Sequence, residues 1–434
     1  MEILSLGEKI KRKRKEYNLT LKELAGDRIT PGQISLVESG KSNPSMDLLE
    51  YLATTLNTSI EYLMESEETQ AESICKYFEN IAQCYILNND LNGAEKYIEK
   101  SLYYAEKYSL EYRKAKNLYF RSIVFMTKGE IGLAQQFFLS ANVIFIKSGS
   151  FEDVVNTFLK LGEISLKLKA YRSASSYFKQ AENVFGDNDI GNDFLLGGIY
   201  YYIAFTYFKL DILDKAINYS YLAKEKFIQL NHKQEYAKVL LLLSKEYSEQ
   251  GDINNAIKYS KKTLNLFKEI NDNIYVSQIE NNLGKLFYEF ENMEESFIHL
   301  YKAKEMREKA NDEKLIETLV NICENYIRMK DITNCKKTLE ELLKYIQSGE
   351  GRSLIEYYLL KYRIDMLEGN DGEAENTLLL ALNFSKTMEG LKQTADISIM
   401  VGKFYVDRGK DKEAAKYLNE GVEILKKLKI IKQR

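Results

Sequence analysis

A small side chain recurs about every forty residues along most of this chain. Successive anchors are 39 to 42 residues apart, and in most units a second small residue follows seven positions later. Aromatic side chains recur three residues after and nine residues before many anchors. Small residues let two helices approach closely and aromatic rings fill the groove between them, so each period predicts one helix pair that must stack on the next. The anchors are Ala94, Ala134, Ala174, Ala216, Ala256, Ser296, Cys335, Ala374 and Ala414.

The distribution of proline agrees with long helices. The chain has two prolines, Pro31 and Pro44, and the 390 residues that follow Pro44 contain none. Proline disrupts a helix interior, so its absence favours helices throughout this region. We therefore expect an all-α protein in which about nine helix pairs span residues 74 to 428.

The repeated pattern resembles the tetratricopeptide repeat. Its period is near 40 residues rather than about 34, and the terminal proline of that consensus is missing. Both departures indicate longer helices. The resemblance implies a right-handed tetratricopeptide-like α-solenoid over residues 74–434.

The first 65 residues follow a different pattern, with short helices and clear start signals. Thr20 is a plausible helix N-cap with Glu23 three residues later, which is the spacing of a capping box. Thr30 precedes Pro31, and proline is favoured in the first helical turn because its missing N–H costs nothing there. Gly40 ends this third helix, and a fourth is expected over residues 46–56.

Three segments carry a second resemblance: LGEKIKRKRKEYNLTLKELA, ITPGQISLVESGKSNPS and LLEYLATTLN. In this order they are similar to the Cro/repressor class of helix-turn-helix domains over residues 4 to 64. The family usually has a Gln at the position of Leu21, where it reaches the phosphate backbone, so that contact is not expected here. The resemblance implies a DNA-binding domain over residues 1–65, whose third helix enters the major groove N-terminus first.

The charge pattern can be interpreted in two ways. The whole chain is nearly balanced, with 61 Lys and Arg against 64 Asp and Glu, but residues 9–15 contain six cations. Such a run is often only a solvated helix face; beside a helix-turn-helix it is suited to phosphate neutralisation. Gln33 could make a bidentate contact to adenine, whereas Ile34 and Val37 face the core and Glu38 fixes the turn. The expected DNA contacts are Lys11, Arg12, Arg14, Thr20, Thr30, Gly32, Gln33, Ser35, Leu36 and Lys41.

Residues 66–73 form an acidic junction without Gly or Pro. We expect a short linker, in either a helical or an extended state, between the DNA-binding domain and the repeats. Such a junction could transmit a rearrangement as well as tether the two domains.

The order of the two domains resembles the peptide-sensing regulators of Gram-positive bacteria, the RRNPP quorum-sensing family. The resemblance implies a homodimer that binds double-stranded DNA through paired heads and holds a short signalling peptide in the concave groove of the repeats. In that family Asn side chains commonly clamp the peptide backbone. The concave positions that we expect to contact peptide are Asn80, Lys116, Asn156, Lys160, Tyr201, Tyr202, Lys238, Lys245, Gln278, Asn281, Asn282, Lys285, Asn321 and Arg328.

Other functions are less consistent with the sequence. An enzyme is not expected, because the chain has no P-loop, no GxSxG and no HExxH, and only two histidines. Neither a cofactor nor a metal site is expected, since the four cysteines match no zinc pattern and are predicted to be reduced and buried. No stretch is apolar enough to cross a membrane, so we expect a cytoplasmic protein. The alternatives that remain open are repeats that bind a protein partner and repeats that only dimerise.

Overall fold

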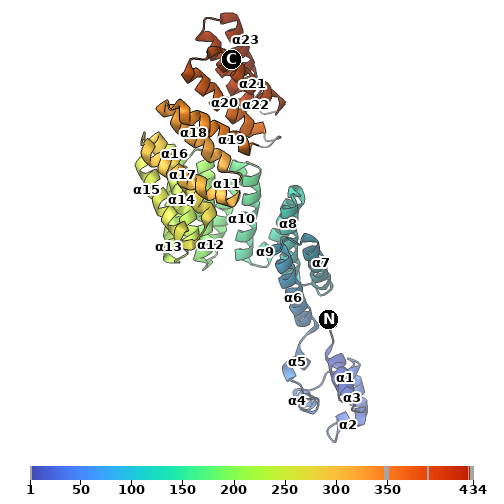
Figure 1. The fold of residues 1–434 in the computed structure, drawn as a ribbon. Helices are drawn as coiled ribbons and strands as arrows, with labels where there is room; N and C mark the ends of the chain where they lie inside the picture. Colours follow the sequence, from blue (N-terminus) through green and yellow to red (C-terminus); the bar gives the residue numbers. More distant parts are fainter. Residues whose placement is uncertain (1, 347–350, 389–390, 429, 431–434) are drawn as a thin grey trace. The chain divides into compact units, whose positions relative to one another are not determined.

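The computed structural model describes residues 2–346, 351–388, 391–428 and 430. This part of the chain is helical and contains no strand, as the proline-free periodicity predicts. The chain forms two compact units, Met1–Ile212 and Leu213–Arg434 (Figure 1). Each unit is described by itself below.

The first unit begins with a small helical domain, the head. Its helices are α1 (Leu6–Glu16), α2 (Leu21–Ala25), α3 (Pro31–Glu38), α4 (Met46–Thr55) and α5 (Ile60–Met64). Helix α5 was not anticipated from the sequence. One cluster of buried side chains holds the five helices together and includes Ile10, Leu24, Ile34, Val37, Leu52, Leu56 and Leu63.

Capping boxes start the first three helices of the head. The predicted pair of Thr20 and Glu23 begins α2, and Thr30 caps α3 with Pro31 at its first position. A third box, not predicted, joins Ser5 to Glu8 at the start of α1. Each box satisfies backbone N–H groups that have no partner within the helix, so these short helices begin at fixed positions.

The repeats begin earlier than the sequence indicated. Helix α6 starts at Glu67, so most of the predicted linker over residues 66–73 is the first part of a repeat helix. Ser66 caps this helix by accepting a hydrogen bond from the N–H of Thr69. The helices of the first unit are α6 (Glu67–Leu87), α7 (Leu91–Lys107), α8 (Glu111–Lys128), α9 (Ile131–Lys147), α10 (Phe151–Lys167), α11 (Tyr171–Asp187) and α12 (Asp193–Lys209).

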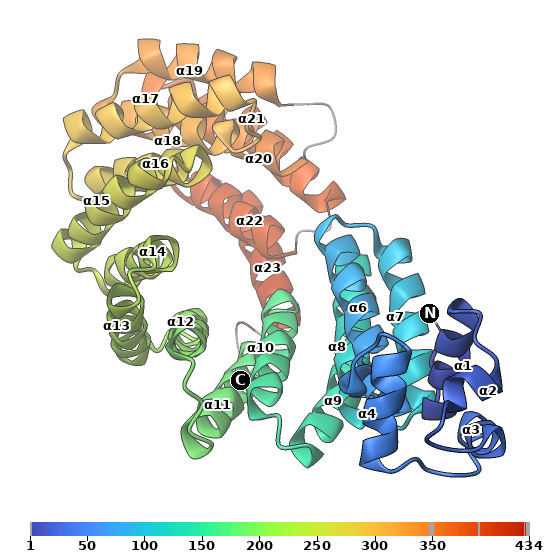
Figure 2. The same ribbon diagram turned by 90° about the horizontal axis from the view of Figure 1, so that it is seen from below.

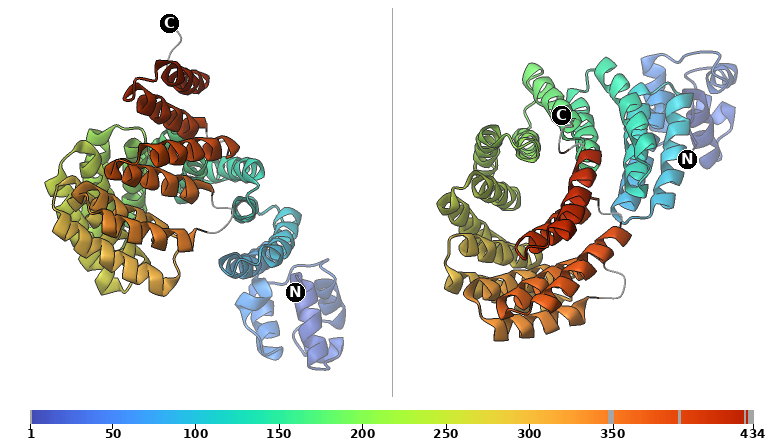
Figure 3. Two further views of the ribbon diagram at one scale, coloured as in Figure 1. Left: turned by 45° about the horizontal axis from the view of Figure 1, so that its top comes forward. Right: turned by 90° about the horizontal axis from the view of Figure 1, so that it is seen from above.

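The second unit continues the same succession of helices (Figure 3). Among the described residues, α6 to α23 make nine consecutive pairs along the sequence, as predicted. The helices are α13 (Leu213–Gln229), α14 (Lys233–Gln250), α15 (Ile253–Ile270), α16 (Asn273–Glu289), α17 (Met293–Ala310), α18 (Leu315–Met329), α19 (Ile332–Tyr345), α20 (Gly351–Glu368), α21 (Asp371–Thr387), α22 (Leu391–Val406) and α23 (Asp411–Lys427).

The small residues lie where the paired helices touch. A Cβ added to Gly284 on α16 would come within 2.5 Å of the Leu300 side chain on α17. Gly162 on α10 meets Phe178 on α11 in the same way. Figure 2 shows α6 beside α7 and α10 beside α11 in the first unit. The forty-residue column of small side chains is therefore a packing requirement.

The cysteines depart from the prediction at one position. All four carry free thiols, and Cys75, Cys323 and Cys335 are buried as expected. Cys84, by contrast, is exposed on α6.

Candidate DNA-binding surface and peptide-binding site

Helix α3 divides its side chains between core and solvent as its sequence predicts. Ile34 and Val37 are buried, with 0% and 3% of their surface exposed. The opposite face is solvent-exposed and includes Leu36, a large apolar side chain that is 46% exposed. The predicted DNA contacts on this helix and its cap all lie on the exposed side: Thr30, Gly32, Gln33, Ser35 and Leu36.

Gln33 also has a structural role, which was not predicted from the sequence. Its Oε1 accepts a hydrogen bond of 2.9 Å from the backbone N–H of Thr30 and one of 3.2 Å from the Thr30 hydroxyl. The side chain is therefore part of the capping box that starts α3. A bidentate contact to adenine uses both Oε1 and Nε2 of a Gln, so it would require this box to open.

The cations of α1 fall into two groups. Lys11, Arg12 and Lys15 are exposed, as are Thr20 before α2 and Lys41 after α3. Arg12 also forms ion pairs with Glu16 and Glu2, yet its side chain stays 54% exposed. These exposed cations remain suited to phosphate contacts.

Arg14 belongs to the second group, and its predicted DNA contact needs correction. Its Nε and Nη2 donate to the carboxylate of Glu38 at 2.6 and 2.9 Å, and its Nη1 donates to the carbonyl of Leu19 at 2.9 Å. The two side chains are only 14% and 8% exposed. This ion pair fastens α1 to the end of α3, which agrees with the structural role predicted for Glu38, and it uses Nε, Nη1 and Nη2 of the Arg14 guanidinium within the head.

Lys9 is the other buried cation of α1. Its Nζ donates to the carbonyl oxygens of Tyr62 and Glu65 at 2.7 and 2.8 Å. Gln70 on α6 pairs with the backbone of Leu4, accepting from its N–H at 3.1 Å and donating to its carbonyl at 2.9 Å. The head is thus hydrogen-bonded to the first repeat helix through side chains that are not exposed.

The second unit contains a cavity of about 120 Å³ among α16, α17 and α18. Two of the predicted peptide contacts, Lys285 and Asn321, line it. The remaining lining residues are Tyr288, Glu289, Leu300, Glu324 and Asn325. The cavity therefore combines amide and charged groups with an aromatic and an aliphatic wall, and its volume is enough for one side chain of a ligand.

A ladder of amides supports this cavity. The Nδ2 of Asn321 donates to the Oδ1 of Asn281 at 3.1 Å, and the Nδ2 of Asn281 donates to Glu317 at 3.3 Å. Asn281 is fully buried. Its predicted role therefore changes from a direct contact to a support that orients Asn321.

Asn325 was missed in the sequence analysis. Its Nδ2 donates to the hydroxyl of Ser296 at 2.7 Å, and it is buried beside the cavity. In other repeats the equivalent position, ten residues before the anchor, holds apolar residues such as Val124 and Ile164 but also the polar Thr206 and Glu246. A polar residue at this position therefore gave no signal that would have singled out Asn325.

The other predicted contacts of the second unit lie outside this cavity. Arg328 donates to the carbonyl of Tyr288 at 2.8 Å and to Glu291 at 2.7 Å, and its guanidinium lies over the Tyr288 ring. Lys238 pairs with Glu235 on its own helix at 2.7 Å. Lys245 is exposed, and Gln278 and Asn282 are half-buried.

In the first unit, two lysines that were predicted to contact peptide form ion pairs with carboxylates of the same unit. Lys116 forms a 2.6 Å ion pair with Asp153, and Lys160 pairs with Glu163 at 2.8 Å. The hydroxyl of Tyr202 donates to Glu163 at 2.9 Å, which ties α12 to α10. Tyr201 and Asn156 are half-buried and Asn80 is exposed.

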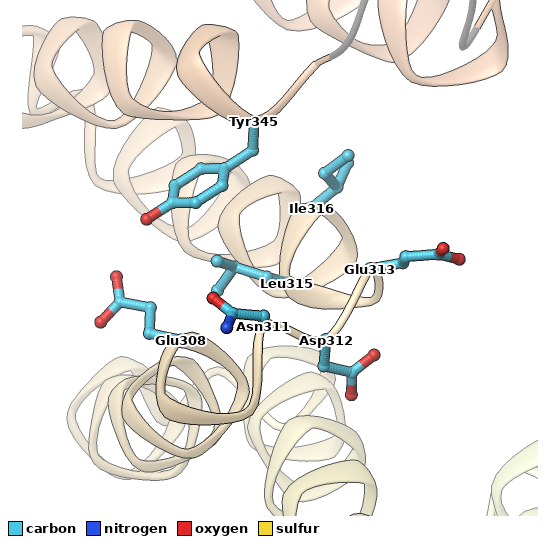
Figure 4. A pocket seen from close by; sticks show the side chains of 7 residues that line it. All are labelled: Glu308, Asn311, Asp312, Glu313, Leu315, Ile316 and Tyr345. Carbon is cyan, nitrogen blue, oxygen red and sulfur yellow. The ribbon is translucent and has the colours of Figure 1, made fainter.

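A larger cavity of about 310 Å³ lies elsewhere in the second unit (Figure 4). It is formed by the end of α17, the start of α18 and the end of α19, and none of the predicted residues lines it. Its walls are Glu308, Asn311, Asp312, Glu313, Leu315, Ile316 and Tyr345. Within the described residues, no cluster of three or more His, Cys, Asp or Glu side chains is placed to hold a metal ion. None of the described helices is long and apolar enough to cross a membrane.

Family models match two parts of the chain. Residues 10–63 match the helix-turn-helix family, and residues 237–269 match the tetratricopeptide repeat. The first match covers most of the head, including α3. The second covers most of α14 and α15, one of the predicted helix pairs.

Named relatives extend the likeness over the repeats. The chain is 25% identical over 276 residues to the response regulator aspartate phosphatase I of Bacillus subtilis (strain 168), across 62% of this chain and 65% of that protein. It is 21% identical over 287 residues to the transcriptional activator NprA of Geobacillus stearothermophilus, across 64% of this chain and 70% of that protein. The match thus spans just under two thirds of the phosphatase.

A solved structure supports the fold. The apo form of the quorum sensor NprR from B. thuringiensis matches with a TM-score of 0.59 and 13% identity, over 83% of this chain and 100% of that chain. At this identity the match supports the succession of repeat helices and carries no residue role.

Proposed function

We propose that this chain, a transcriptional regulator of the RRNPP family, binds operator DNA through its head and a short signalling peptide through its repeats. Peptide binding changes the affinity for DNA. The relatives named as a transcriptional activator and a quorum sensor support this function. The regulator works in the cytoplasm without catalysing a reaction.

The observation that carries the peptide half of the proposal is the amide-lined cavity of the second unit. Asn321 uses its Nδ2 on Asn281, which orients its Oδ1 as an acceptor for the N–H of a peptide. Lys285 supplies a cation for a carboxylate, while Tyr288 and Leu300 supply apolar contacts. These groups suit one side chain of a peptide and the backbone beside it, which is as much as a cavity of about 120 Å³ holds.

The DNA half rests on the exposed face of α3 and the exposed cations around it. Thr30 and Leu36 are presented to solvent by a helix that the Ile34 and Val37 side chains fix to the core. A homodimer would place two such helices on half-sites about 34 Å apart, one turn of the double helix. A peptide that prefers one arrangement of the heads would then shift the population toward it.

Purification from the native host tests the peptide half directly. The protein is isolated without denaturation, and native mass spectrometry identifies what remains bound after gel filtration. We expect an oligopeptide of about 5–10 residues, lost when Asn321 is changed to Ala. Asn183→Ala, an exposed amide on α11, is the matched control and should retain the peptide.

Other outcomes would change the assignment. An empty protein that instead captures a folded partner would support repeats that bind protein. An empty protein whose DNA affinity is insensitive to every peptide from its host's spent medium would leave a DNA-binding regulator without a peptide ligand.

A further inference from the structure

Helix α9 presents an unusual exposed surface. Leu133, Leu139, Val143 and Ile146 are between 41% and 53% exposed and lie along one face of the helix. The rest of that face is Gly132, Gln136, Ser140 and Lys147. Apart from the terminal lysine, the face therefore carries no charge over its whole length.

Neighbouring repeats show what this position usually contains. Forty residues earlier, α7 exposes Tyr103 among mainly charged residues: Lys96, Glu99, Lys100, Glu106 and Lys107. Forty residues later, the exposed face of α11 between Arg172 and Asp187 is uncharged but carries no aliphatic side chain: it consists of Ser173, Ser176, Gln180, Asn183 and Gly186. An exposed helix face has no need of Val or Ile, which form helices less readily than Lys or Glu, so the apolar stripe of α9 indicates a partner that covers it.

The spacing of the stripe identifies what kind of partner fits. The exposed positions are 132, 133, 136, 139, 140, 143, 146 and 147, and they are mirrored about the point between 139 and 140. A twofold axis through that point would place Leu133 opposite Ile146 of a second copy, and Leu139 beside Ser140. The same axis places Gln136 opposite Val143, so two antiparallel α9 helices would bring aliphatic side chains together at Leu133 and Ile146 and set one aliphatic side chain against an uncharged polar one elsewhere.

Charge supports the same arrangement. A twofold axis brings identical surfaces together, so a charged face would meet its own sign at the centre, whereas the centre of α9 is uncharged. The only charges are at the ends, where exposed Glu130 precedes α9 and Lys147 closes it. Antiparallel pairing brings the Lys147 end of one copy to the Glu130 end of the other.

We propose that α9 forms an interface between two copies of this chain, around a twofold axis that passes between Leu139 and Ser140. This inference rests on the homodimer suggested above and assigns a surface to it. The second copy would bury the stripe of Leu133, Leu139, Val143 and Ile146.

Charge reversal near the axis provides the test. Leu139→Glu and Leu139→Lys each place like charges against each other, and each should raise the dissociation constant of the dimer at least tenfold in analytical ultracentrifugation. An equimolar mixture of the two variants should recover dimers, because the opposite charges then meet. Glu99→Lys, at the equivalent exposed position of α7, should leave the dimer unchanged.

A second measurement does not depend on charge. In a Cys84→Ser background, Ser140→Cys should form an intermolecular disulfide when copper phenanthroline removes the electrons, whereas Lys100→Cys on α7 should not. A dimeric wild type with dimeric Leu139 variants and no Ser140 cross-link would overturn the α9 interface and leave the homodimer standing. A wild type that stays monomeric at all concentrations would overturn both.

Discussion

The side-chain amide of Asn321 donates a 3.1 Å hydrogen bond to the Oδ1 of Asn281, forty positions earlier in the chain. The two residues come from the first helices of consecutive repeats, so the repeat period itself brings them together. Asn281 is fully buried and Asn321 is 7% exposed at the edge of the cavity. The pair therefore links the packing of two repeats to the orientation of one proposed ligand contact.

Substitution of either Asn should weaken peptide binding for a different reason. Asn321→Ala removes a proposed contact and leaves the fully buried Oδ1 of Asn281 without its donor, so we expect at least a tenfold loss of peptide affinity and a loss of about 1–3 kcal/mol in the free energy of unfolding. Asn281→Ala leaves the Nδ2 of Asn321 without its acceptor and should cost a similar free energy, with a smaller loss of affinity because Asn321 itself remains. Isothermal titration with the co-purified peptide and urea denaturation measure the two quantities. A larger loss of peptide affinity for Asn281→Ala than for Asn321→Ala would contradict this division of roles.

Arg14 and Lys15 are adjacent cations that should respond oppositely. Arg14→Ala leaves Glu38 buried without its partner, and we expect the head to lose about 3 kcal/mol of stability. Lys15→Ala should leave stability unchanged and reduce the salt dependence of DNA binding by about one charge. Thermal denaturation and fluorescence anisotropy at several salt concentrations distinguish the two. If Arg14→Ala kept full stability but bound DNA more weakly, Arg14 would be assigned as a phosphate contact, as first predicted.

Gln33 offers a test of whether DNA opens the capping box. Gln33→Glu keeps an acceptor for the Thr30 N–H, so the start of α3 should be preserved. A Glu cannot donate to adenine, so a bidentate reader would lose about 1–3 kcal/mol of discrimination at that base. Selection of bound sequences from a random duplex library measures the change. An identical preferred sequence for both proteins would assign Gln33 to the cap alone.

Because of the buried carboxyl of Glu246, we expect the protein to become less stable as pH rises. It is fully buried on α14, with Ser220 as its hydrogen-bond donor at 2.9 Å, and its Oε2 has no partner within the described residues. Burial raises the pKa of this carboxyl from 4.5 to about 8. The folded state therefore binds the proton more tightly than the unfolded chain, and stability is lost as pH rises from about 4.5 through 8.

Glu246→Gln removes this titration. The variant and wild type should have similar stability near pH 4.5, and the variant should be more stable by roughly 2–4 kcal/mol above pH 8. Urea denaturation at both pH values measures the difference. Glu249→Gln, an exposed carboxylate on the same helix, should show none. A difference for Glu246→Gln that does not change with pH would indicate a packing effect instead.

Local and periodic features of the fold could be predicted from the sequence. The caps at Thr20 and Thr30 depend on residues three positions apart, and the core positions Ile34 and Val37 follow from the spacing of apolar residues in one helix. The repeat anchors required only that the same packing problem recur every forty residues. Gly284 and Leu300 illustrate this: the Leu300 side chain occupies space that is open because Gly284 has no side chain.

The functional roles of single residues were harder to predict from the sequence. A cation in a sequence is compatible with phosphate, with peptide or with an internal carboxylate, and local sequence cannot distinguish them. Lys116 meets Asp153, 37 positions away, and Arg14 meets Glu38, 24 positions away. Both pairs form because separate helices are brought side by side.

The sequence by itself therefore determined the all-helical class, the order of the head and the repeats, and the positions where helices pair, because each of these depends on neighbours along the chain. Only the tertiary structure decided which polar side chains remain available to a ligand. Asn321 lines a cavity while Asn281 supports it, and Lys11 is exposed while Lys9 is buried. The physical reason is that the burial and partners of a polar group are set by helices distant in sequence, and these decide whether its hydrogen bonds are already satisfied.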